Sequence, residues 1–191
     1  MFNQSATSRK FLLEWVVANI IGFTVGSLIG ATDFSLISGW LGSSLPARIV
    51  GDVFFSTSIA LAQYWVFRRH FPQSNSRLIW WIPLSIIGFI LGARLATAVV
   101  PRITIDEVPL SIGFGIVLGG FFGTVHWVGM QFLGTLKAKR PILWIPACIV
   151  AWIIAELIGF GLDFNQLGVP LLALAIGIVT GVSLIVWIQP E

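Results

Sequence analysis

One passage occurs three times in this chain and constrains its fold more than any other feature. Each copy opens on a tryptophan, at Trp15, Trp81 or Trp144, and continues as an apolar run with a small residue at every fourth position. The small residues are Gly22, Gly26 and Gly30; Gly88, Gly92 and Ala96; and Ala151, Ala155 and Gly159. The tryptophans lie 66 and 63 residues apart. An internal period of this length indicates one structural unit in several copies, so we expect three related helical hairpins in a single domain.

Alignment of the tryptophans places further residues in common columns. A polar column holds Asn19, Ser85 and Cys148, and an aromatic column holds Phe23, Phe89 and Trp152. In the second half of the unit, Gln63 corresponds to His126 at an offset of 63 residues. The third copy keeps Gly177 and Gly181, and we interpret it as having lost the polar position. The predicted repeats cover about 11–69, 78–135 and 141–188.

Six apolar stretches occupy most of the chain. They cover residues 11–31, 49–67, 78–100, 109–135, 142–162 and 169–188. Each is close to the ~20 residues that a helix needs to cross a bilayer. Only 10% of the residues are charged and the mean hydropathy is +0.94, which excludes an ordinary soluble domain, where about a quarter are charged. We expect an all-α polytopic membrane protein with six transmembrane helices arranged as three hairpins.

The basic residues predict the orientation of these helices. Eight of them fall on one side of the predicted membrane, at Arg9, Lys10, Arg68, Arg69, Arg77, Lys137, Lys139 and Arg140, against Arg48 and Arg102 on the other. The acidic residues Asp33, Asp106, Glu107 and Asp163 fall in the opposite loops. Short loops rich in Lys and Arg stay in the cytoplasm. We therefore expect both termini on the cytoplasmic side, and a lipid bilayer rather than a nucleic acid as the partner of the basic residues.

Three ionisable residues lie within the predicted spans. Arg94 in span 78–100 and Glu156 in span 142–162 are at matching depth in equivalent helices, and Asp52 lies just inside the outer end of span 49–67. A charge at this depth usually pairs or lines a wet cavity, since inserting it costs about 2.5–3.5 kcal/mol. Arg94 and Glu156 could neutralise one another. Alternatively they line an outward-facing pocket, in which Arg94 holds an anionic group or Glu156 carries a proton or binds a cation.

Uncharged polar residues form a second group of candidates. Gln63 and His126 occupy equivalent positions in the cytoplasmic half of the membrane, and Asn19 belongs to the polar column. Interhelical hydrogen bonding explains such residues in membrane bundles. A functional alternative is a proton path, or ligation of the central metal of a pigment by His126 or Gln63. We expect no cofactor otherwise.

The tryptophans and the small residues each have a structural interpretation. Six tryptophans fall near the cytoplasmic ends of their spans, where an aromatic belt anchors membrane proteins: Trp15, Trp65, Trp80, Trp81, Trp144 and Trp187. Small residues at every fourth position lie on one helix face and allow close helix packing. We expect a tightly packed bundle rather than a glycine-lined conduit.

No pattern of residues indicates catalysis or a metal centre. The chain lacks a G-x-S-x-G elbow, an H-E-x-x-H motif and a phosphate-binding loop, so the sequence predicts that it is not an enzyme. Its only cysteine is Cys148, and its two histidines, His70 and His126, are far apart in the sequence. We therefore expect no catalytic residues and no metal site.

Residues at the ends of the hairpins carry a family resemblance. The segments Ala60-x-x-Gln63-Tyr64-Trp65 and Gly123-x-x-His126-Trp127 are each followed by a basic loop and a tryptophan-led helix. This unit resembles that of uncharacterised tandem-hairpin membrane proteins of bacteria, including cyanobacteria. The resemblance implies a multi-pass protein of the bacterial inner membrane or the thylakoid membrane, and it implies no activity. In length and helix number the chain is also similar to the substrate-capturing subunits of energy-coupling-factor transporters.

Two functions agree with these features. The first is the binding or transport of a small molecule or lipid within the bundle, with Arg94 and Glu156 at its outer end. The second is a non-catalytic accessory or scaffold subunit of a larger membrane complex, or a homo-oligomer, whose faces contact neighbouring helices, lipids or pigments. Intramembrane charges in a self-contained bundle favour the first.

Overall fold

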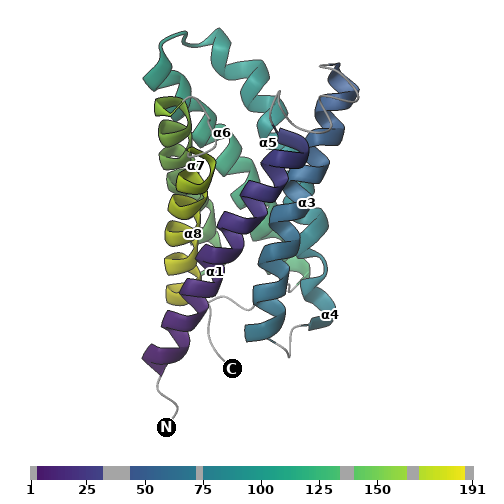
Figure 1. Cartoon of the computed structure of the whole chain (residues 1–191), viewed down its shortest axis with the longest axis vertical. Helices are drawn as coiled ribbons and strands as arrows, with labels where there is room; N and C mark the ends of the chain where they lie inside the picture. The colour runs from purple at the N-terminus through teal and green to yellow at the C-terminus, as the bar shows by residue number, and fades with distance from the viewer. Residues whose placement is uncertain (1–3, 32–43, 72–74, 134–139, 163–167, 188–191) are drawn as a thin grey trace.

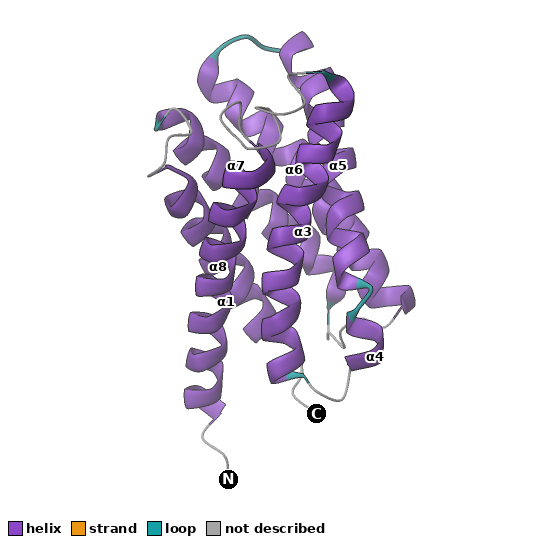
Figure 2. Cartoon of the chain, turned by 45° about the vertical axis from the view of Figure 1, so that its right-hand side comes forward, coloured by secondary structure: helices purple, strands orange, loops and turns teal. Residues whose placement is uncertain are grey.

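The computed structural model describes most of the chain as helices. It describes every residue except 1–3, 32–43, 72–74, 134–139, 163–167 and 188–191. Four of the charged loop residues in the orientation argument, Asp33, Lys137, Lys139 and Asp163, lie outside the described residues, as does the side chain of Trp187. Within the described part there is no strand (Figure 2), which confirms the all-α class.

Six helices are long and apolar enough to cross a membrane, as the six apolar stretches predict. They are α1 (Gln4–Gly26), α3 (Leu45–His70), α5 (Trp81–Val99), α6 (Glu107–Val128), α7 (Trp144–Gly161) and α8 (Gly168–Trp187). π-helical turns extend α1 over Ser27–Ala31 and α6 over Gly129–Leu133. The short helix α4 covers Asn75–Leu78, and single 3₁₀ turns cover Val100–Arg102 and Pro141–Leu143. The side of the membrane on which the termini lie stays a prediction.

Proline sets the starting points of three helices. Helices α5 and α7 both begin with Trp-Ile-Pro, so that Pro83 and Pro146 fall in the first turn. The first turn has no intrahelical acceptor for its N–H groups, so proline loses nothing there. Helix α3 begins similarly with Pro46, and the hydroxyl of Ser44 accepts a hydrogen bond from the N–H of Ala47 at 3.4 Å.

The six long helices form a closed ring in chain order. Each packs against the next, from α1 through α3, α5, α6 and α7 to α8, and α8 packs back against α1. In Figure 1 the helix α1 runs obliquely between α8 and α3. Because every helix has two neighbours, each presents one face to the centre of the ring and one to the surroundings.

Glycines bring the backbones of neighbouring helices into contact. A Cβ atom on Gly119 of α6 would lie 2.6 Å from the carbonyl oxygen of Cys148 in α7, and one on Gly22 of α1 would lie 2.8 Å from the Cα atom of Ile59 in α3. Real Cβ atoms do not approach other atoms so closely. The small-residue stripes therefore act as packing surfaces, which favours the packed bundle over a glycine-lined conduit.

The outward faces of the ring are apolar. Leu13, Leu61, Leu91, Val150 and Ile178, each from a different helix, are all 45% exposed or more. In water such a surface would be unfavourable, whereas in a bilayer it contacts hydrocarbon. The apolar faces therefore support contact with lipid on all sides of the ring.

Three tryptophans do not lie where the aromatic belt was predicted. Trp15, Trp81 and Trp144 are 0%, 0% and 2% exposed, whereas Trp65 and Trp80 are 55% and 52% exposed. The belt interpretation is wrong for the first three, because their helices turn them toward the centre of the ring. There the rings of Trp81 and Trp144 are 6.0 Å apart.

The columns aligned in the sequence are buried together. The three tryptophans, the polar column Asn19, Ser85 and Cys148, and the aromatic column Phe23, Phe89 and Trp152 are all 8% exposed or less. Members of a column come from α1, α5 and α7, and successive columns are four residues apart, so each helix presents them on one face. This arrangement agrees with the predicted repeat, which itself stays a prediction.

Candidate functional site

A belt of hydrogen-bonded polar side chains crosses the interior of the ring. We call it the inner belt and define it by seven residues: Trp15, Asn19, Gln63, Trp81, Ser85, His126 and Thr180. All seven are 4% exposed or less. Polar groups cost several kcal/mol in hydrocarbon unless they are hydrogen-bonded, so their partners decide whether the belt is a structural element or a binding site.

Gln63 is the centre of the belt. Its side-chain nitrogen donates to Oδ1 of Asn19, and its oxygen accepts from the indole N–H of Trp81, both at 2.9 Å. The amide nitrogen of Asn19 donates to the carbonyl oxygen of Trp15 at 2.8 Å. Gln63 thereby links α1, α3 and α5, and both of its polar atoms are occupied.

His126 continues the belt from α5 to α6. Its Nδ1 lies 2.8 Å from the carbonyl oxygen of Phe122, and its Nε2 lies 2.9 Å from the hydroxyl of Ser85. A carbonyl only accepts, so Nδ1 donates, and in the neutral ring Nε2 then accepts from Ser85. With both nitrogens engaged inside the bundle, neither is directed at a pigment.

Thr180 closes the belt from α8 to α1. Its hydroxyl accepts from the indole N–H of Trp15 at 2.9 Å and donates to the carbonyl oxygen of Ile176 at 2.6 Å. The interpretation that span 169–188 lacks the polar position is therefore wrong. Thr180 occupies a place in α8 comparable to that of Gln63 in α3, because each accepts from a tryptophan of the next helix around the ring.

The correction follows from a different spacing in the third hairpin. One pattern of small, small and polar residues recurs in Ser56, Ala60 and Gln63; in Gly119, Gly123 and His126; and in Ala173, Gly177 and Thr180. Cβ atoms on Gly123 and Gly177 would lie 2.8 Å from the Cα atom of Ile145 and 3.0 Å from that of Val16. Ile145 and Val16 each follow a buried tryptophan, so the two glycines occupy corresponding places.

Helix α7 does not join the inner belt. The indole nitrogen of Trp144 is buried without a hydrogen-bond partner among the described residues, although Trp15 and Trp81 each have one. His126, the neighbour that would match Gln63, is bonded to Ser85 instead. Side-chain hydrogen bonds therefore connect five of the six helices and leave α7 with a free donor.

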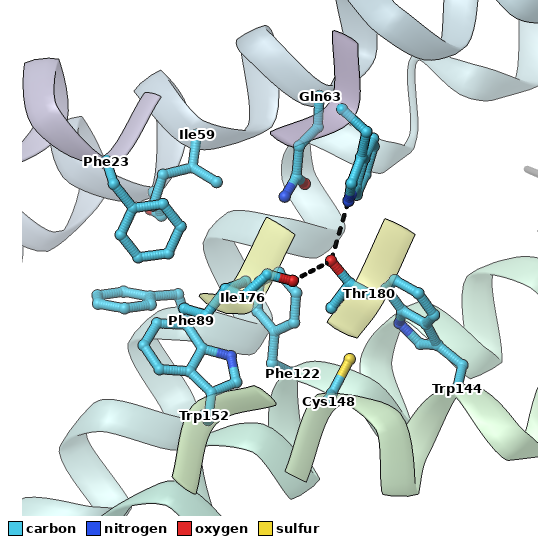
Figure 3. Close-up of a pocket in the computed structure, with 12 residues that line it drawn as sticks. Phe23, Ile59, Gln63, Phe89, Phe122, Trp144, Cys148, Trp152, Ile176 and Thr180 are labelled. Carbon is cyan, nitrogen blue, oxygen red and sulfur yellow. Dashed lines mark hydrogen bonds between the residues drawn. The ribbon is translucent and has the colours of Figure 1, made fainter. Parts of the chain in front are cut away.

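A small cavity lies beside the belt at the centre of the ring. All six long helices contribute to its lining, and four of the lining side chains are polar: Ser56, Gln63, Cys148 and Thr180. The space open to the centre of a water molecule is about 10 Å³. In Figure 3 the indole nitrogen of Trp144 lies on the side of its ring that faces Cys148 and Thr180. The interior is thus filled except for a space of about one water molecule.

Aromatic rings separate this cavity from the far end of the bundle. We call Phe23, Phe89 and Trp152 the aromatic layer. The ring of Trp152 lies 5.8 Å from that of Phe23 and 5.9 Å from that of Phe89, and Phe55 contacts both phenylalanines at 5.4 and 4.9 Å. These spacings are those of favourable aromatic contacts. The aromatic layer closes the axis of the ring above the inner belt.

Asp52 and Arg94 form an ion pair beyond the aromatic layer. Nη2 of Arg94 donates to Oδ2 of Asp52, and Arg48, one turn earlier in α3, adds a second positive charge near the carboxylate. The side chain of Arg94 is 31% exposed and that of Asp52 is 13% exposed. Arg94 therefore pairs with Asp52 and not with Glu156, so the proposed Arg94–Glu156 staple is wrong.

Glu156 lies on the inward face of α7. It follows Trp144, Cys148 and Trp152 at intervals of four residues and is 9% exposed. Among the described residues, no ion pair or hydrogen bond is made by its carboxylate. Glu156 is thus the predicted site residue that the structure leaves without a partner.

The remaining histidine lies at the opposite end of the ring from Glu156. Nε2 of His70, the last residue of α3, is 2.9 Å from Oε2 of Glu14 in α1, and Nη1 of Arg69 is 3.5 Å from Oε1 of the same carboxylate. The described residues contain no cluster of three or more His, Cys, Asp or Glu side chains that could hold a metal ion. The contacts of His70 therefore link α1 to α3.

Comparisons of the chain with protein-family models, with curated proteins and with solved structures find no match. The resemblance to tandem-hairpin membrane proteins stays a prediction. Functional reasoning therefore depends on the geometry of the ring alone.

Proposed function

We propose that this membrane protein binds or transports a small cation or a proton within its six-helix ring, with Glu156 as the binding group. The observation that carries this proposal is a buried carboxylate on the inward face of α7 for which no protein partner is found among the described residues. Acidic side chains inside membrane proteins pair, or they mark ion and proton sites. Glu156 has no such pair.

The neighbouring ion pair supports the choice of a cation over an anion. Arg94 would attract an anion, but its guanidinium group is already bonded to Asp52. Removing Asp52 from Arg94 to admit an anionic group would leave one charge uncompensated, at a cost of about 3–5 kcal/mol. Glu156 has no such contact to lose, so a positive charge has the more favourable site.

The small residues weigh against the accessory-subunit alternative. That function needs free helix faces for neighbouring chains, and glycine stripes are the usual docking surface. Gly22 and Gly26 pack on α3, and Gly115, Gly119 and Gly123 pack on α7. These stripes are therefore occupied within the chain.

Thermal unfolding of the purified protein in lipid nanodiscs tests cation binding. The chlorides of sodium, potassium, ammonium and methylammonium are compared with choline chloride at equal ionic strength. We expect one of the small cations to raise the Tm of the wild type and to leave that of Glu156→Gln unchanged. Glu107→Gln is the matched control, because Glu107 is an exposed carboxylate at the start of α6 and its loss leaves Glu156 in place.

A carbodiimide tests the proton alternative in the same preparation, since it modifies protonated carboxyl groups in apolar surroundings. We expect mass spectrometry to locate the adduct on Glu156, and the adduct to diminish as the pH is raised. A cation effect without an adduct assigns the site to that cation, and an adduct without a cation effect assigns it to the proton. The absence of both would overturn the proposal.

A further inference from the structure

The indole N–H of Trp144 differs from its counterparts elsewhere in the ring. Trp15, Trp81 and Trp144 all lie on inward faces, and the first two donate to Thr180 and Gln63 at 2.9 Å. Trp144 is 2% exposed, and its nitrogen has no partner among the described residues. Buried indole N–H groups are nearly always hydrogen-bonded, so this donor points to a ligand.

The cavity beside Trp144 has the size and the polarity for one water molecule. A water needs about 10–15 Å³ of space for its centre and two to four polar partners, and the cavity offers about 10 Å³. Its lining includes Trp144, Cys148 and Thr180. The hydroxyl oxygen of Thr180 accepts one hydrogen bond from Trp15 and has a second lone pair, while the sulfur of Cys148 is a weak acceptor.

We propose that this cavity binds a single water molecule, which accepts a hydrogen bond from Trp144 and donates to Thr180 and Cys148. The water extends the inner belt to α7, the one long helix that the side-chain hydrogen bonds do not reach. It also provides a polar ligand position at the membrane interior, on the far side of the aromatic layer from Glu156. The proposal involves neither Glu156 nor a cation, so it stands or falls separately from the proposed function.

Nuclear magnetic resonance of the protein with nitrogen-15-labelled tryptophan tests this site. In nanodiscs of deuterated lipid, magnetisation transfer from water to each indole proton is measured at short mixing times. The Trp144 signal is assigned by its loss in Trp144→Phe. Where that variant does not fold, Cys148→Ser, which keeps the size of the neighbouring side chain, assigns it by a change in chemical shift.

We expect direct transfer from water to the Trp144 indole proton and none to those of Trp15 and Trp81. The latter two are internal controls in the same sample, because they are equally buried and bonded to protein oxygens. No transfer to Trp144 would overturn the proposal. Equal transfer to all three would also overturn it, because it would mean general water penetration.

Discussion

Trp81 and Trp144 stand at the same place in their helices, yet their indole groups have different surroundings. The N–H of Trp81 donates to Gln63, whereas that of Trp144 faces the cavity. Loss of the indole therefore has different consequences for the protein atoms that remain. At Trp81 it strands a buried acceptor, and at Trp144 it strands no protein group.

Phenylalanine substitutions at the two positions test this difference. Both changes remove the same atoms, so their packing costs are comparable. Trp81→Phe also leaves Oε1 of Gln63 without its donor, which costs about 1–3 kcal/mol more. We expect the free energy of unfolding, measured in bicelles, to fall further for Trp81→Phe than for Trp144→Phe. Equal losses would show that the Gln63 bond contributes little.

Asp52 and Arg94 illustrate how a membrane-embedded charge depends on its partner. Arg94→Gln leaves Asp52 buried beside only the exposed Arg48, and Asp52→Asn leaves Arg94 alone. We expect each single change to lower the free energy of unfolding by about 3–5 kcal/mol. The double variant should be more stable than at least one single variant, because no uncompensated charge remains.

A double-mutant cycle measured by reversible unfolding checks this coupling. Glu156→Gln, added to each corner of the cycle, is the control for the pairing. If Arg94 is coupled to Glu156 instead of to Asp52, the coupling energy will change when Glu156 is removed. An unchanged value agrees with the pair seen in the structure.

Thr180 shows what residue-level pattern matching misses. The first two hairpins share an offset of 63 residues between Gln63 and His126, but Thr180 follows His126 by only 54. Alignment on the glycines Gly177 and Gly181 therefore passes over the threonine. A search that allowed the hairpins to differ in loop length would find the small, small and polar pattern. The partner of Thr180, the indole of Trp15, comes from the far end of the chain and follows only from ring closure.

At the scale of whole helices, the stripe on α6 sets the distance to α7. Gly119 faces the α7 backbone, whereas a Cβ atom on its neighbour Gly120 would meet nothing closer than 3.9 Å. The pair offers a matched test, since both changes replace glycine by alanine at adjacent helical positions. Any gain in helix propensity is the same for both.

We expect Gly119→Ala to destabilise the protein by about 1–3 kcal/mol, because the new methyl group would force α6 and α7 apart. Gly120→Ala should be neutral or slightly stabilising. Unfolding in bicelles, followed by tryptophan fluorescence, measures both. Equal effects would mean that α6 and α7 do not pack through this stripe in the bilayer.

The helices themselves were predictable, whereas their rotation was predicted only in part. Hydropathy places all six spans, since a bilayer imposes a minimum length of apolar residues. The tryptophans at the helix starts were interpreted as lipid anchors from depth alone. Their spacing of four residues to Asn19, Ser85 and Cys148 shows that they share the inward face. The pairing of Arg94 with Asp52 could not be predicted, because depth does not determine which neighbouring helix a long side chain reaches.

At the scale of the whole molecule, orientation is the open property with the sharpest test. The described basic residues Arg68, Arg69, Arg77 and Arg140 lie at one end of the ring, which the positive-inside rule assigns to the cytoplasm. The single native cysteine, Cys148, is buried. It should therefore not react with a maleimide in the folded protein, so new cysteines can be placed in the wild-type background.

We expect Ile105→Cys to react with a membrane-impermeant maleimide added to intact cells, and Ile142→Cys to react only after the cells are opened. Ile105 and Ile142 are 87% and 50% exposed and lie at opposite ends of the ring. Gel-shift labelling of both variants, with the wild type as a blank, reads out the result. The reverse pattern would place the termini outside and the Glu156 end inside.

The contact between α8 and α1 has a consequence for how such a protein could be assembled. With the last helix seated against the first, the ring contains no hairpin that is structurally first or last. The start of α1 and the end of α8 lie at the same end of the ring (Figure 1). A circular permutant that joins these ends and opens the chain between α3 and α5 would keep every helix pair. The order of hairpins along the gene is then free to change while their order around the ring is retained.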